Sequence, residues 1–123
     1  MKALARRFKA YEYFAPTKKA AIERYELRLL PQPVLRFEDQ KAGLVDGAIF
    51  FLAYGTNPEV ALLIQADREG DAEPAWTYGL ARMGRAELHV NLDDSEAWTQ
   101  KSVPNPSIHE PYTGYNRRNV PER

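Results

Sequence analysis

The imidazole of His89 is the side chain in this sequence best suited to acid–base chemistry, because histidine alone titrates near neutral pH without perturbation. His89 lies in the alternating segment 86–92, where Glu87 and Asn91 fall on the same side of an expected strand. A carboxylate beside an imidazole can orient it as a general base. An ordinary strand face exposed to water has the same polar pattern, so His89 and Glu87 are functional candidates and no catalytic residue is assigned.

Large aromatic residues on the expected strands form a second group of candidates. Aromatic side chains on strands usually fill the space under a sheet, but in a curved sheet they also line ligand pockets. The pattern does not separate these two roles, and it leaves Tyr78 and Trp76 as candidates for either. The full set comprises Phe50, Tyr54, Trp76, Tyr78 and Trp98.

Metal chemistry finds little support. His89 and His109 are the two histidines, and they lack the helical spacing of a histidine pair that binds zinc. The acidic loop that begins at Asp67 fails the calcium-loop template, because position six would be Ala72 and position twelve Tyr78. We therefore predict neither a metal site nor a cofactor.

Motifs of nucleophilic catalysis are missing. The chain has no cysteine, which excludes disulfides, thiolate catalysis and iron–sulfur clusters. None of its three serines lies in a G-x-S-x-G motif, and no Walker A loop or dinucleotide fingerprint occurs. The sequence thus favours a binding role over an enzymatic one.

Size and composition are those of one globular domain. The chain has 123 residues and a mass of 14.1 kDa, with 44% hydrophobic and 28% charged residues. The longest apolar run, Ala48–Tyr54, is too short to cross a bilayer, and residues 2–14 lack the apolar stretch of a signal peptide. We expect a soluble, cytoplasmic protein.

Charge is unevenly distributed along the chain. Residues 1–36 hold nine basic and three acidic residues, whereas residues 37–98 hold four basic and twelve acidic ones. Residues 99–123 are again basic, and the formal net charge is zero. This asymmetry is typical either of partner-binding arms or of arms that fold back onto an acidic body.

Residues 1–14 are expected to form a short amphipathic helix. Leu4, Phe8 and Tyr11 follow a helical spacing, and residues 17–24 could add a second short helix. Arg6 and Arg7 lie among these apolar residues. Basic and aromatic residues together can bind nucleic acid or an anionic membrane, but the neutral chain and its acidic middle argue against both.

From Tyr25 the period changes to two, which predicts strands. A hairpin with a loop over residues 55–59 is the strongest signal, and both faces of its strands are apolar, so both are expected to be covered. The expected strands are 25–30, 34–37, 46–54, 60–65, 75–83, 86–92 and 96–101. The fold class is therefore mainly β (α+β): an antiparallel meander sheet or partly closed barrel, with a short N-terminal helix. A sandwich or an open sheet covered by the helix also fits.

The final segment, 102–123, is rich in proline and has no regular period, which predicts an extended tail. Tyr112 and Tyr115 are apolar enough to dock on a surface. We divide the chain into a basic N-terminal helical arm (1–24), an antiparallel β domain (25–101) and this tail.

The functional hypothesis is a small non-enzymatic interaction or assembly protein. It would bind a protein partner or a second copy through its N-terminal helix and its tail. The predicted binding residues are Leu4, Arg6, Arg7, Phe8, Tyr11, Tyr112 and Tyr115. The alternatives are a β domain with a ligand pocket between sheet and helix, and an enzyme that uses His89 with Glu87, Tyr78 or Arg82.

Overall fold

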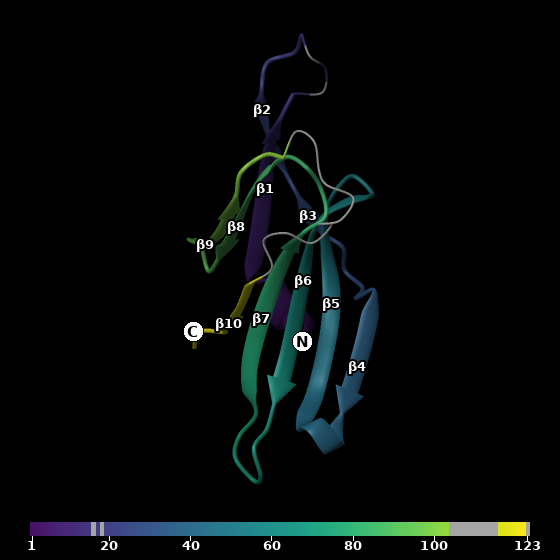
Figure 1. The fold of residues 1–123 in the computed structure, drawn as a ribbon, viewed down its shortest axis with the longest axis vertical. Coiled ribbons are helices and arrows are strands. Elements are labelled where there is room, and N and C mark those ends of the chain that lie inside the picture. Colours follow the sequence, from purple (N-terminus) through teal and green to yellow (C-terminus); the bar gives the residue numbers. More distant parts are fainter. Residues whose placement is uncertain (16, 18, 104–115, 123) are drawn as a thin grey trace.

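Most of the chain forms antiparallel strands, arranged in two sheets (Figure 1). The structure is a computed structural model, and it describes every residue except 16, 18, 104–115 and 123. The four-stranded sheet has the order β2-β1-β8-β9, with β1 Phe8–Phe14, β2 Glu23–Glu26, β8 Glu87–Leu92 and β9 Ser95–Gln100.

The six-stranded sheet has the order β10-β7-β6-β5-β3, and β4 also pairs with β5. Its strands are β3 Arg28–Leu29, β4 Leu35–Asp39, β5 Leu44–Tyr54, β6 Asn57–Asp67, β7 Ala75–Arg82 and β10 Asn116–Asn119. Two short helices, α1 Lys2–Ala5 and the 3₁₀ turn η1 Gln40–Ala42, complete the described elements. The long strands β5, β6 and β7 run side by side in Figure 1.

The mainly antiparallel β fold with a short N-terminal helix is confirmed. The described strands form two separate sheets and no closed barrel. The meander prediction holds for β5, β6 and β7, which pair in sequence order. The four-stranded sheet departs from it, because β1 is inserted between β2 and β8.

The core lies between the facing sides of the two sheets. Alternate residues of β1 and β8 contribute from one sheet, and alternate residues of β5, β6 and β7 from the other, as the two-residue period of strands requires. The larger side chains of this core include Phe8, Phe50, Leu52, Leu62, Ile64, Tyr78, Leu80, Leu88, Val90 and Trp98.

The helix expected over residues 1–14 is wrong beyond Ala5, because residues 8–14 form β1. Phe8 and Ala10 are buried and alternate with exposed Lys9, so the segment also has a period of two. Pairing with β2 on one side and β8 on the other gives its backbone hydrogen bonds that an isolated short helix could not retain in water. The second helix, expected over 17–24, is also wrong, since its last two residues begin β2.

The hairpin between β5 and β6 is tighter than expected. Asn57 pairs with Tyr54, and the turn consists of Gly55 and Thr56 in place of a five-residue loop. Gly55 has a φ of 62°, a conformation that glycine adopts without steric cost.

The C-terminal tail contributes a strand that its composition did not predict. Asn116–Asn119 pairs with the edge of β7, and the amide of Val120 donates to the carbonyl of Trp76 at 2.9 Å. Tyr112, Tyr115 and His109 lie outside the described residues.

Candidate functional sites: a histidine row, a buried carboxyl pair and an apolar sheet face

His89 occupies the centre of the outer face of the four-stranded sheet. Its cross-strand partners are Tyr11 on β1 and Thr99 on β9. The rings of Tyr11 and His89 stack with centroids 4.8 Å apart and planes inclined by 4°. The guanidinium carbon of Arg24 lies 3.7 Å from the centroid of the Tyr11 ring. A row of stacked groups therefore crosses this face from β2 to β8.

Both ring nitrogens of His89 face polar groups. Nε2 lies 2.7 Å from Oε2 of Glu87, and Nδ1 lies 3.5 Å from the hydroxyl of Thr99 and 3.7 Å from Oε1 of Glu96. The predicted placement of Glu87 beside the imidazole is thus found. The hydroxyl of Thr99 donates to Glu96, so its proton is directed away from the imidazole. This arrangement orients His89 but does not activate Thr99 as a nucleophile.

Tyr78 and Trp76 do not join this row. Both lie on β7 and pack toward the core between the sheets, where Tyr78 is buried and meets the ring of Phe8 edge-on at 5.0 Å. The structure therefore separates the aromatic candidates of β7 from His89 and Glu87.

The predicted N-terminal binding residues have several different environments. Phe8 is 2% exposed and Leu4 packs against the core, so neither could lie in the groove of a partner without opening the fold. Arg7 donates two hydrogen bonds to Asp93 and a third, at 2.8 Å, to the carbonyl of Pro121. It thereby fastens the residues after β10 to the turn between β8 and β9. Arg6 is exposed.

Two glutamates meet between the sheets, and their meeting was not predicted from the sequence. Glu12, on the inner side of β1, is 1% exposed, and Glu59, on β6, is 7% exposed. The register of β5 and β6 shifts here: Leu52 pairs with Val60 and Ala53 with Pro58, so Glu59 falls at a bulge. Bulges redirect side chains, and this one brings the carboxyl group of Glu59 to that of Glu12.

The two carboxyl groups are hydrogen-bonded to each other. Burial, the charge of Glu59 and this hydrogen bond raise the pKa of Glu12 to about 7, so below neutral pH Glu12 keeps a proton that it can donate to Glu59. Burial also raises the pKa of Glu59, although hydrogen bonds from Asn57 and Glu12 and the charge of Arg82 oppose that rise. One proton is therefore shared between two buried carboxyl groups.

Arg82 is the buried cation beside this pair. Its Nε donates to the carbonyl of Gly84 at 2.9 Å, Nη1 to that of Lys101 at 2.7 Å, and Nη2 to that of Ala86 at 2.6 Å. Burial lowers the pKa of Arg82, and the charge of Glu59 opposes this. The guanidinium group thus joins the ends of β7 and β9 to the start of β8, and it balances the single negative charge of the pair.

Period-two analysis of residues 8–14 would have placed Glu12 on the buried side with Phe8 and Ala10. Glu59 carried no such signal, because its inward direction results from a bulge. Arg82 was noted only as a possible partner of His89, and the structure places it with the carboxyl pair instead.

Gly84, which follows β7, lies against the carboxyl group of Glu59. A Cβ atom built on Gly84 would collide with Oε2 of Glu59. We therefore expect Gly84→Ala to displace this carboxyl group and to lower the free energy of unfolding by about 2 kcal/mol. Urea denaturation would measure the loss. A loss of less than about 0.5 kcal/mol, the range of ordinary surface substitutions, would contradict the prediction.

The outer side of the six-stranded sheet carries a continuous apolar surface. Cross-strand pairing aligns Leu35 with Ile49 and Leu63, and Phe51 with Ala61 and Ala81. Leu35 is 53% exposed, and the other side chains are partly open to solvent. We call this surface the apolar outer face; it consists of Leu35, Phe37, Ile49, Phe51, Ala61, Leu63 and Ala81.

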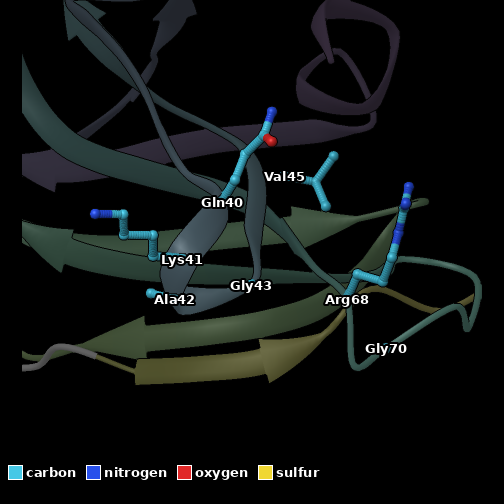
Figure 2. Close-up of a pocket in the computed structure, with 7 residues that line it drawn as sticks. All are labelled: Gln40, Lys41, Ala42, Gly43, Val45, Arg68 and Gly70. Carbon is cyan, nitrogen blue, oxygen red and sulfur yellow. The ribbon is translucent and has the colours of Figure 1, made fainter.

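A hollow in the described part of the chain lies where β5 begins and β6 ends, and α1 contributes no residue to its lining. Its volume is about 650 Å³. Figure 2 shows Val45 and Arg68 projecting to the same side of the hollow and Lys41 extending away from them. The residues that line it are Gln40, Lys41, Ala42, Gly43, Val45, Arg68 and Gly70. The pocket expected between sheet and helix therefore does not correspond to this hollow.

Comparison with protein-family models, with curated proteins and with solved structures found no match for this chain. Within the described residues, no three histidine or acidic side chains are arranged to hold a metal ion. None of the helices described has the length and apolarity needed to span a membrane.

Proposed function

We propose that this chain is a non-enzymatic interaction or assembly protein that binds a protein partner or a second copy of itself. The observation that carries the proposal is the apolar outer face. A sheet of a soluble domain commonly buries one face and exposes a polar one, but here Ile49, Phe51 and Leu63 lie opposite the core. Contiguous apolar surface of this kind marks interaction sites.

The docking surface differs from the one expected from the sequence. Residues 8–14 belong to the fold, so the six-stranded sheet takes the place of an N-terminal helix as the binding element. Exposed Val34 and Leu35 extend the apolar surface to the edge at β4. The tail keeps a supporting role, since β10 covers the opposite edge at β7.

The two alternatives have weaker support. A ligand pocket would need a concave site, and the hollow near Arg68 lies away from the sheet–helix junction where the pocket was expected. An enzyme based on His89 would need a group for the imidazole to activate, and the hydroxyl of Thr99 is engaged with Glu96.

Leu63→Glu tests the proposal, because Leu63 is central in the apolar outer face and a buried unpaired carboxylate strongly disfavours docking. We expect association to weaken by about tenfold or more while circular dichroism retains the β signal. Light scattering after size-exclusion chromatography, with chemical crosslinking, measures the association. Lys9→Glu is the matched control on the outer face of the other sheet, where the Lys9 side chain is 75% exposed. Equal association of wild type and Leu63→Glu would refute the role of this face.

A further inference from the structure

Three aromatic rings cluster next to Glu12: Phe14 follows it by two residues on the same face of β1, and Tyr25 is its Cα partner on β2. Ring centroids of Phe14 and Tyr25 are 4.4 Å apart, those of Tyr25 and Tyr54 are 5.2 Å apart, and those of Phe14 and Tyr54 are 5.6 Å apart. These rings come from β1, β2 and the end of β5, so they join the four-stranded sheet to the six-stranded one. We call them the aromatic cap.

The groups that face the carboxyl pair come from every adjacent strand. From β6, the amide of Asn57 donates to Oε1 of Glu59 at 2.6 Å, and from β7 Arg82 supplies one positive charge. The Cα partners of Glu12 are Tyr25 on β2 and Leu88 on β8. Leu88 is apolar, and the hydroxyl of Tyr25 donates to Glu23 at 3.3 Å.

The charges balance in only one protonation state of the pair. With one proton shared, the pair carries one negative charge opposite the guanidinium group of Arg82. Without that proton it carries two, and the second lies on Glu12, whose Oε2 has no hydrogen-bond partner among the described residues. An uncompensated charge in a space closed to water strongly opposes closure.

We propose that the Glu12–Glu59 pair is a proton-operated latch between the two sheets. While the proton is shared, β1 stays closed against the bulge of β6 next to the aromatic cap. Loss of the proton leaves two like charges in contact, and β1 and β2 move away from β6. The movement uncovers the half-buried rings of Phe14 and Tyr25 beside Tyr54, which is already 43% exposed. The latch therefore sets the pH above which an additional aromatic surface is available.

Hydrogen–deuterium exchange of the full chain between pH 5 and pH 8, corrected for the intrinsic pH dependence of exchange, tests this proposal. In the wild type we expect protection in β1, β2 and the start of β6 to fall more than tenfold over this range, while the centres of β6 and β7 stay protected. In Glu12→Gln the pair cannot lose a proton from residue 12, so the pH dependence in β1 and β2 should disappear. Glu26→Gln, an exposed acid on β2, is the matched control and should behave as the wild type.

Two results would overturn the latch. One is protection in β1 and β2 of the wild type that does not change between pH 5 and pH 8, which decides the matter even if the variants do not fold. The other is the same pH response in Glu12→Gln as in the wild type. A loss of protection spread evenly over both sheets would also contradict it, since this result indicates global unfolding.

Discussion

Replacing Arg82 by methionine is expected to lower the free energy of unfolding by about 3–5 kcal/mol, because three hydrogen bonds from a buried, charged donor are lost. Three backbone carbonyl groups, those of Gly84, Ala86 and Lys101, lose a charged donor in this variant. Glu59 also loses the positive charge opposite it. Methionine fills part of the volume, so the effect reports the lost polar contacts more than a cavity.

Chemical denaturation followed by the fluorescence of buried Trp98 measures this effect. Arg28→Met is the matched control, because Arg28 is exposed and donates one hydrogen bond, to the carbonyl of Gly55. We expect the control to cost less than about 1 kcal/mol. Arg82→Lys should lie between the two, since an ammonium group retains the charge but not the planar fork. A cost of less than about 1 kcal/mol for Arg82→Met would show that the buried guanidinium group does not hold these strands together.

Stability is expected to fall as pH rises from about 4.5 to about 7. The pKa of Glu12 is about 7 in the folded protein and 4.5 in the absence of its environment, so between these values the folded state binds more protons than the unfolded chain. The loss of stability caused by ionising Glu12 is absent below the lower pKa and complete above the higher one. One pKa unit corresponds to about 1.4 kcal/mol, so the full loss is about 3–4 kcal/mol. The raised pKa of Glu59 acts in the same direction.

Unfolding free energies of wild type and Glu12→Gln, measured by urea denaturation from pH 4 to pH 8.5, test this dependence. The difference between the two proteins isolates residue 12 from the other acids. We expect the free energy of unfolding of Glu12→Gln to rise relative to that of the wild type as the pH increases. Above pH 7 the variant should be the more stable protein. Glu26→Gln should follow the wild-type profile. Parallel profiles for wild type and Glu12→Gln would refute a shared buried proton, whatever the outcome of the exchange experiment.

The strands β5 to β9 were predicted from the two-residue period of their apolar side chains. Val60, Leu62 and Ile64 alternate strictly, and the structure buries all three, so these strands were predicted to within a few residues. His89 and Glu87 likewise share an outer face as expected. In each case the pattern is local, and the side chains keep to the faces that their spacing assigns.

Residues 8–14 show where local patterns become ambiguous. Leu4, Phe8 and Tyr11 fit a helix, whereas Phe8 and Ala10 fit a strand, and the acidic Glu12 conceals the strand pattern. Pairing with residues 87–92 decides between the two structures, and nothing within the segment itself specifies that partner. The carboxyl pair depends both on this distant pairing and on a bulge in β6. A local sequence pattern predicts neither of them, so the pair could not be predicted from the sequence.

The position of β1 has a consequence for how the molecule forms. Its partner β8 is made some eighty positions later in the chain, so on the ribosome the first strand waits, with Phe8 uncovered, until most of the polypeptide has emerged. Contacts between residues so far apart in the sequence slow folding, because the chain loses conformational entropy before the stabilising contacts have formed. We therefore expect this domain to complete its fold only after synthesis, and the nascent chain to depend on protection from aggregation in that interval.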